Sequence, residues 1–277
     1  MLNPIEGEIF YIDKPLKWTS FEVVKKVRAR LRKRLDIKSL RVGHAGTLDP
    51  LATGVLTICT GRATKRIEEL QAGVKEYIAH IRLGETTPSF DLETQVDATY
   101  PWQHITREQV EKVLREQFTG TIEQVPPAFS ACKIDGKPAY KLARKGREVE
   151  IRAKTLVIDE IELMECGLPQ EPSLVIRVVC SKGTYIRALA RDIGVALGSG
   201  AHLTALRRTR IGDIRVENCL SVDSLLTQLE TEEMVSPDCA EQERLERERE
   251  HNRAMARARK AEQEARLRAR KTRQSQL

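Results

Sequence analysis

The 277-residue chain carries 47 Lys and Arg against 40 Asp and Glu, which gives a net charge of +7 at pH 7 and a pI near 9.1. A basic protein of this kind is attracted to polyanions, above all to nucleic acids. No apolar run approaches the roughly 20 residues that a spanning helix needs, which argues against a membrane protein. The length allows one large domain or two small ones, with a substantial core.

The six cysteines are scattered, with no Cys-x-x-Cys pair and no histidines at ligand spacing. This distribution argues against a zinc site and against a disulfide scaffold, so we expect no metal. The N-terminal segment has neither a basic start nor an apolar core, which is unlike a signal peptide. We therefore expect a reducing, cytoplasmic compartment.

The first elements are predicted within residues 8–35. Residues 8–12, EIFYI, read as a short buried strand that the turn DKP closes. In the segment 19–35, Thr19 or Ser20 is the expected N-cap, and apolar residues recur at helical spacing. The other face of this helix carries seven Lys or Arg, offset within the helix only by Glu22. Such a face is either simply solvated or meets phosphates, and we favour phosphates.

The middle of the chain continues with strands, helices and one long polar segment. In order, we expect a buried strand at 54–61, a helix at 62–71, a strand at 75–84, a long exposed loop at 85–103 and a helix at 106–120. The last of these has Thr106 as its N-cap, and Gln109 completes a capping box.

The later elements mix strands and helices without a regular βαβ alternation. We expect turns with a basic helix over 124–146, two strands at 155–166 and 173–183 that can pair antiparallel, a helix at 184–200, and a strand and turn at 202–216. The absence of regular alternation predicts the α+β class.

A change in composition near Ser236 and Pro237 divides the chain. We therefore predict a globular domain over 1–235 and a tail over 236–277. The tail is dominated by Arg, Glu, Ala and Gln and has few large apolar residues, so it cannot form a core of its own. We expect a solvated helix or a partly disordered arm.

The stretch RVGHAGTLDPLATGVL, residues 41–56, surrounds a single acid, Asp49, with turn-forming residues. Ordinary turn chemistry explains most loop acids of this kind. Three glycines in the stretch would let a ligand approach the backbone, and His44 and Thr47 add polar groups. A lone carboxylate does not suit two-carboxylate glycoside hydrolysis. It can act as a nucleophile when a cation keeps it ionised.

A candidate cation lies in CSKGTYIRALARDIG, residues 180–194. Residues 182–184 form a strand-to-helix corner, where a helix N-terminus would favour anions. Arg187 follows near the start of that helix, away from its apolar stripe. From spacing alone it is equally compatible with a surface arginine.

Together these residues resemble the TruB-type tRNA pseudouridine synthases. GHAGTLDPLATGVL matches their pattern G-H-x-G-x-L-D-P-x-A-T-G-x-L completely. KEYIAHIRLG, QVPPAFSACKIDGKPAYKLARKG, CSKGTYIRALARDIG and GAHLTALRRTRIG resemble further family segments in the same order. The resemblance covers about residues 8–225. It implies a pseudouridine synthase fold, with a mixed, largely antiparallel central sheet and the active-site cleft on that sheet.

The resemblance also implies roles for seven residues. Asp49 matches the catalytic aspartate, Arg187 the arginine that pairs with it, and Tyr77 the tyrosine that stacks on the target base and is a candidate for proton abstraction from the ribose. The substrate-binding positions are matched by His44, which helps hold the flipped-out nucleotide, by Tyr185 and Leu206, which line the uracil pocket, and by Lys65, which borders the site. Attack at uracil C6, attack at ribose C1′ and a glycal route all stay open. None of them needs a metal or another cofactor.

Two departures from the family pattern concern RNA contacts. LGETTPSFDLET has Ser89 where the family has threonine and Thr94 where it has glycine, so the geometry of this RNA-contacting loop does not carry over. Many bacterial members end in a PUA domain, and here the Arg/Glu tail follows instead.

Three functions fit these observations. The first is pseudouridine formation at position 55 in the T-loop of tRNA, after the base is flipped out, by a monomer with no guide RNA. The second is the activity of a guide-RNA-dependent relative, against which the missing PUA domain counts. The third is a tRNA-folding chaperone without chemistry.

Overall fold

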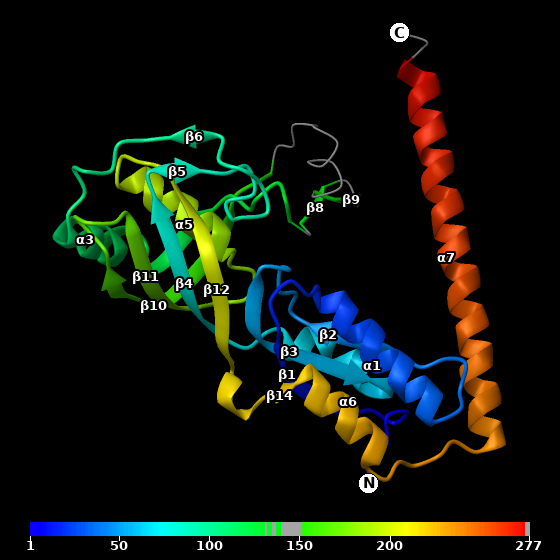
Figure 1. Ribbon diagram of the computed structural model, residues 1–277. Helices are drawn as coiled ribbons and strands as arrows, with labels where there is room; N and C mark the ends of the chain where they lie inside the picture. The colour runs from blue at the N-terminus through cyan, green and yellow to red at the C-terminus, as the bar shows by residue number, and fades with distance from the viewer. Residues whose placement is uncertain (131, 135–136, 140–150, 275–277) are drawn as a thin grey trace.

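The computed structural model describes residues 1–130, 132–134, 137–139 and 151–274 (Figure 1). The strands are β1 Ile9–Lys14, β2 Val42–Ala45, β3 Ala52–Thr60, β4 Lys75–Leu83, β5 Glu85–Thr86, β6 Ala98–Thr99, β7 Gly120–Gln124, β8 Lys133–Ile134, β9 Lys137–Pro138, β10 Lys154–Cys166, β11 Ser173–Cys180, β12 Ala201–Ile211, β13 Ile214–Arg215 and β14 Leu220–Ser221. The helices are α1 Ser20–Arg34, η1 Gly61–Arg66, α2 Ile67–Leu70, α3 Arg107–Gln117, α5 Ile186–Ala196, η2 Val216–Asn218, α6 Val222–Thr231 and α7 Cys239–Gln274. The basic helix expected within 124–146 falls largely outside the described residues.

One ten-stranded sheet organises the molecule. Its order is β14-β1-β3-β12-β4-β11-β10-β7, and β2 and β13 pair with β3 and β12 at the side of this path. Only the pairs β1–β14 and β3–β12 are parallel, and the other pairs of this sheet are antiparallel. The expected α+β fold with a mixed, largely antiparallel sheet is confirmed. The antiparallel pairing expected for 155–166 with 173–183 is also confirmed, as β10 and β11.

The long strand β12 joins two halves of the sheet and fixes the register at its centre. Arg208 on β12 lies opposite Gly54 on β3 and opposite Tyr77 on β4. Two residues earlier, Leu206 lies opposite Ala52 and Ala79. Residues far apart in the sequence thus form two rows across three strands, separated by the row of Arg207, at the point where β3 begins.

Two hydrophobic clusters lie on either side of this centre. One contains α3 and α5 packed on β4, β10 and β11, and the other contains α1 and α6 packed on β1 and β3. Figure 1 shows these helices in two lobes of the molecule, with β12 between them. Each half of the sheet is therefore covered by its own pair of helices, and β12 lies where the two halves meet.

The helix ends follow the capping chemistry of the sequence. Thr19 caps α1 and forms a capping box with Glu22, and Thr106 does the same for α3 with Gln109. On α1 the exposed side carries cations, two of which lie over aromatic rings: Lys25 over Phe21 and Lys26 over Trp18.

Two expectations need correction. The helix expected at 62–71 is divided into the 3₁₀ helix η1 and the four-residue helix α2, which ends where the Lys75 ammonium binds the carbonyls of Gln71 and Gly73. The loop expected to be exposed at 85–103 is anchored, because Thr87, Ser89 and Asp91 are buried. Polar composition predicted a loop there correctly but could not show that its polar groups turn inward.

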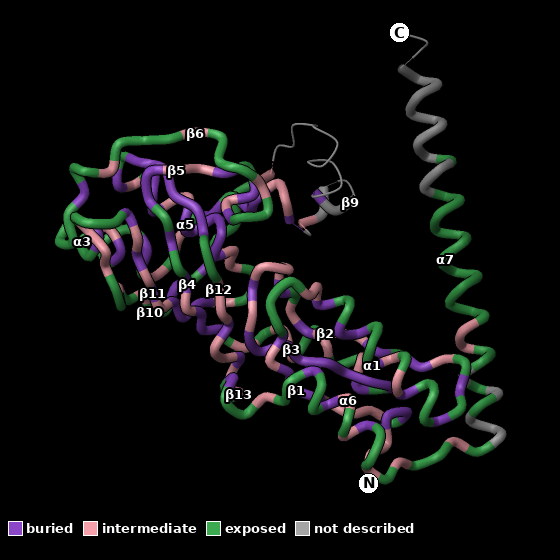
Figure 2. Tube along the Cα trace, viewed as in Figure 1, coloured by how far each residue is buried: buried purple, intermediate pink, exposed green. Residues whose placement is uncertain are grey.

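The tail forms one long helix, α7. Figure 2 shows its described residues mostly exposed, with a half-buried stretch at Glu248 and Arg249, and it leaves the body beside the end of α1. The sequence had left a helix and a partly disordered arm open, and the structure has the helix. The division into a domain 1–235 and a tail 236–277 remains a prediction.

None of the described helices combines the length and the apolar character that crossing a membrane would require.

Candidate active site

The loop between β2 and β3 carries Asp49, and the start of α1 holds it in place. The buried hydroxyl of Ser20 donates to the carbonyl of Leu48 at 3.0 Å and accepts from the Leu48 N–H at 2.9 Å. The Lys17 N–H donates to the carbonyl of Pro50 at 2.8 Å. The loop is therefore fixed through its backbone, which leaves the carboxylate of Asp49 free to face the cleft.

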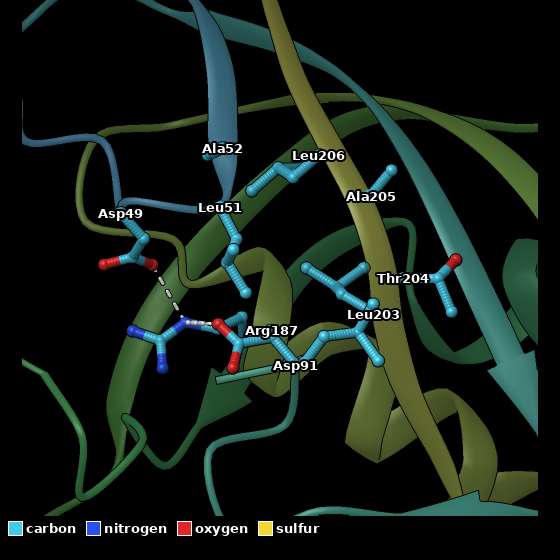
Figure 3. A pocket seen from close by; sticks show the side chains of 10 residues that line it. Asp49, Leu51, Ala52, Asp91, Arg187, Leu203, Thr204, Ala205 and Leu206 are labelled. Carbon is cyan, nitrogen blue, oxygen red and sulfur yellow. Dashed lines mark ion pairs between the residues drawn. The ribbon is translucent and has the colours of Figure 1, made fainter. Parts of the chain in front are cut away.

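Arg187 supplies the cation for this carboxylate. Its Nε lies 2.9 Å from Oδ2 of Asp49 and 3.7 Å from Oδ2 of Asp91 (Figure 3). The Arg187 and Asp91 side chains are 5% and 8% exposed, whereas that of Asp49 is 39% exposed. One buried guanidinium thus lies between a buried carboxylate and one that reaches the solvent of the cleft.

The remaining hydrogen-bonding groups of Arg187 are fixed by the backbone. Nη1 donates to the carbonyl of Ser89 at 3.0 Å, and Nη2 donates to the carbonyl of Phe129 at 2.9 Å. The sequence left open that Arg187 is a surface arginine, and this alternative is wrong. With a bond on each of its three nitrogens the guanidinium has a fixed orientation, so it also orients Asp49.

Sequence reasoning missed Asp91. The signal that could have found it is the aspartate of LGETTPSFDLET, which matches the family's D in that segment. The two departures from the family pattern in this loop contact each other, since the Ser89 and Thr94 hydroxyl oxygens are 2.8 Å apart and the Ser89 N–H donates to Oγ1 of Thr94 at 3.1 Å. The two residues that depart from the family pattern therefore stabilise the loop through hydrogen bonds to each other.

Opposing effects act on the pKa of Asp49. Partial removal from bulk water raises the pKa of Asp49, the Arg187 guanidinium opposes that rise, and the nearby Asp91 carboxylate adds to it. An ionised Asp49 therefore depends on Arg187, because desolvation alone favours the neutral acid.

Five of the seven predicted site residues line one cleft of about 730 Å³: Asp49, Tyr77, Tyr185, Arg187 and Leu206. A hollow of about 20 Å³, room for a single water, adjoins it beside the ion pair and is lined in part by Leu51 and Leu203 (Figure 3). The cleft has the size of a small-ligand site. Its described lining combines the carboxylate of Asp49 with several cations, of which Arg187, Arg208 and Lys75 are buried, and with apolar and polar side chains.

His44 and Lys65 are not among the described residues that line this cleft. His44 lies on β2, and its Nδ1 is buried without a hydrogen-bond partner in the described part of the chain. Burial lowers the pKa of His44, and the nearby Arg208 lowers it further. Lys65 is exposed on η1. Their substrate-binding roles remain predictions.

Arg208 is a second buried arginine that sequence reasoning did not select. Its Nε donates to the carbonyl of Val55 at 2.8 Å, and its Nη2 donates to the carbonyl of Gly46 at 2.9 Å. Its positive charge also lies close to Tyr77, the residue opposite it on β4, and opposes the rise that burial causes in the Tyr77 pKa. Arg208 therefore connects the loop before Asp49, the strand after it and the predicted stacking tyrosine.

Tyr185 precedes α5 and is held by a reciprocal pair of bonds. The Tyr185 N–H donates to Oε1 of Gln124 at 2.9 Å, and Nε2 of Gln124 donates back to the Tyr185 carbonyl at 3.2 Å. Gln124 is buried and begins the QVPP segment. Because of this clamp the first turn of α5, with Arg187 in it, keeps its position relative to β7.

Two lysines near the loop have an unusual protonation equilibrium. The pKa of Lys14 and that of Lys75 are each lowered to about 8, mainly by burial, and the nearby Arg208 contributes to both shifts. Within the described residues, no group of three His, Cys, Asp or Glu side chains lies close enough to share a metal ion.

Residues 32–186 match the sequence model of the TruB family pseudouridylate synthase N-terminal domain, and residues 187–245 match that of the tRNA pseudouridylate synthase B C-terminal domain. The chain belongs to the TruB family of pseudouridine synthases. A protein of Phocaeicola vulgatus called tRNA pseudouridine synthase B is 66% identical, over 85% of this chain and 100% of that protein. A protein of the same name from Flavobacterium johnsoniae is 50% identical, over 79% of this chain and 94% of that protein.

Solved structures support the same fold. The structure described as a Cbf5-Nop10-Gar1 complex superimposes with a TM-score of 0.59 at 30% identity, over 81% of this chain and 55% of the matched chain. This TruB-family chain thus spans little more than half of that neighbour. As a member of the family it is a pseudouridine synthase, an isomerase.

Proposed function

We propose that this enzyme isomerises uridine to pseudouridine at position 55 in the T-loop of tRNA, without a guide RNA and as a cytoplasmic monomer. The observation that carries the proposal is the Asp49–Arg187 pair of 2.9 Å at the cleft. The names of the relatives, tRNA pseudouridine synthase B, support the tRNA substrate.

The reaction breaks the bond from N1 of uracil to C1′ of ribose and forms a bond from C5 to C1′. C5 loses its proton and N1 gains one, so the product is an isomer and no electrons are exchanged with another molecule. One way to hold the two fragments while the base turns is covalent attachment of one of them to a nucleophile. In our proposal Asp49 is that nucleophile, because an ionised carboxylate beside a fixed guanidinium is both reactive and oriented.

The base has to leave its stack before Asp49 can reach it. Extrusion of a nucleotide costs a few kcal/mol, and contacts in an aromatic or apolar pocket compensate. Tyr77, Tyr185 and Leu206 provide such surfaces in the cleft. Because burial raises the Tyr77 pKa, its hydroxyl stays protonated at neutral pH. We therefore favour stacking over proton abstraction as the role of Tyr77.

The test is to incubate the purified chain alone with an unmodified tRNA transcript and to map pseudouridine. We expect product at position 55 with the wild type and none with Asp49→Asn. Asp213→Asn, which changes an exposed carboxylate in the turn between β12 and β13, serves as the matched control and should retain full activity.

Three outcomes would contradict all or part of the proposal. Product that forms only after a guide RNA and partner proteins are added would favour the guide-dependent alternative. Tight tRNA binding without product from the wild type would favour the chaperone. Product at a uridine outside the T-loop would leave the chemistry but change the substrate site.

A further inference from the structure

The helix α7 has an uneven charge distribution along its length. From Cys239 to Glu250 it carries five Glu against three Arg, whereas from His251 to Gln274 it carries nine Arg or Lys against two Glu. The second half alone has a surplus of seven positive charges, as large as the net charge of the whole chain. Charge of one sign concentrated in this way on an exposed helix points to a polyanionic partner.

The acidic half of α7 contacts the body of the protein. Oε1 of Glu246 lies 2.9 Å from Nζ of Lys38, and Glu248 forms an ion pair with Arg41. Lys38 and Arg41 lie between α1 and β2, so two acids of the helix meet two cations of the same segment. Each exposed pair is weak by itself, but together they set where the helix leaves the body.

The described side chains at the start of the basic half of α7 do not pack on the body. Residues 251–262 are all exposed, as Figure 2 shows in green along the middle of the helix. A helix of this length extends about 1.5 Å per residue, so its basic half alone reaches some tens of ångströms. Arg253, Arg257 and Lys260 are spaced by four and three residues, which brings them to one side of the helix.

The helix is also outside what the family comparison explains. The family models end at residue 245, so most of α7 lies beyond them. The Phocaeicola vulgatus relative is matched over its whole length by 85% of this chain, which therefore has residues that the relative lacks. The proposed reaction at Asp49 does not require these residues.

We propose that α7 is an RNA-binding arm: its acidic half anchors it at Lys38 and Arg41, and its basic half binds phosphates of the tRNA outside the T-arm. The inference rests on the proposed function for the identity of the RNA. The T-arm hairpin is only part of a folded tRNA, and the cleft is sized for a nucleotide, so most tRNA phosphates lie outside the cleft. The exposed Arg253, Arg257, Arg259 and Lys260, together with the further basic residues of the sequence after them, match such a surface in charge.

The test compares two RNAs and three forms of the full-length chain. The RNAs are an unmodified whole tRNA and an isolated T-arm hairpin. The proteins are the wild type, the neutralised variant R253Q/R257Q/R259Q/K260Q and the charge-preserving variant R253K/R257K/R259K/K260R, which is the matched control. Dissociation constants are measured at several salt concentrations, and pseudouridine formation in the hairpin is measured in parallel.

We expect the neutralised variant to bind whole tRNA at least tenfold more weakly at low salt. The slope of log Kd against log salt should fall by about 2–4, since each phosphate contact contributes close to one unit. Binding and modification of the hairpin should change less than twofold. The charge-preserving variant should behave as the wild type with both RNAs.

The following results would overturn the proposal that α7 is an RNA-binding arm. The first is an unchanged tRNA affinity and salt slope in the neutralised variant. The others are an equal loss of affinity for the hairpin and an equal loss of tRNA affinity in the charge-preserving variant. Weakened binding to anionic lipid vesicles with unchanged tRNA binding would also overturn it and would favour a membrane partner. A hairpin that is never modified contradicts the proposed function instead, so the two failures are distinguishable.

Discussion

The guanidinium of Arg187 donates to Asp49 across 2.9 Å while only 5% of its side chain is exposed. A buried cation beside one partly exposed carboxylate favours the ionised form of that carboxylate and opposes the rise that burial causes in its pKa. The carbonyls of Ser89 and Phe129 and the carboxylate of Asp91 complete its surroundings. The reactivity proposed for Asp49 therefore depends on a residue that lies 138 positions away along the chain.

Arg187→Gln should reduce both activity and stability. Removing one partner of a buried ion pair costs about 3–5 kcal/mol, because Asp91 remains buried without its cation. The loss of orientation at Asp49 should lower kcat about 100-fold, as displacement of a reacting group by 1 Å does. Arg191→Gln, one turn later on α5 and paired with Asp192, is the control and should leave kcat within about twofold. Thermal unfolding and single-turnover rates measure the two effects, and equal kcat values for the two variants would contradict the role of Arg187.

The pH dependence should move in opposite directions when the two neighbours of Asp49 are neutralised. Asp91 raises the pKa of Asp49 and Arg187 lowers it. Asp91→Asn should therefore shift the acid limb of kcat/KM to lower pH, and Arg187→Gln should shift it to higher pH. The limb in kcat/KM reports the free enzyme, so full pH–rate profiles with a T-arm hairpin are the measurement. A shift in the same direction for both variants would show that the limb belongs to another group.

Substitutions of the neighbours Arg207 and Arg208 on β12 should differ sharply in their effect on the free energy of unfolding. Arg208 is buried, and Arg208→Met leaves the carbonyls of Gly46 and Val55 unpaired, at about 1–3 kcal/mol for each buried acceptor. Arg207 forms a half-exposed pair with Asp13, so Arg207→Gln should cost less than about 1 kcal/mol. Urea unfolding measures both. The first variant should also lose kcat, because its side chain holds the loop that carries Asp49. A similar stability for both variants would show that the bonds from Arg208 to Gly46 and Val55 do not stabilise the fold.

Gly54 should tolerate no side chain. It has a φ of +105°, and a Cβ there would overlap the backbone carbonyl of Arg208 on the adjacent strand. Gly212 also has a positive φ, +54°, but a Cβ there meets nothing within 4 Å. Gly212→Ala should therefore cost only the backbone strain, about 1 kcal/mol, and Gly54→Ala several times more. Melting temperatures compare the two, and equal shifts would show that strain alone decides at Gly54.

Local chemistry in the sequence predicted local structure. The capping boxes at Thr19 and Thr106 and the apolar strands at 75–84 and 173–183 are decided by neighbours within a few residues, because hydrogen bonds and side-chain periodicity act over that range. The motif around Asp49 and the ordered segments after it were sufficient to predict the family and the fold. The helix at 62–71 was predicted less well, because at its start the N–H groups of Gly61 and Arg62 donate to carbonyls of distant parts of the chain.

The tertiary structure decided which polar groups are buried together. Nothing within the sequence of β12 shows that Arg208 points inward and Arg207 outward, since a strand alternates its faces but does not name the covered one. Composition placed Asp91 in an exposed loop, and only the folded chain buries its carboxylate beside Arg187. The register that aligns Gly54, Arg208 and Tyr77 across three strands is a property of pairing between distant segments. The sequence by itself determined the types of the reactive residues and the secondary structure around them. Only the folded sheet determined the distance that places the carboxylate of Asp49 beside the guanidinium of Arg187.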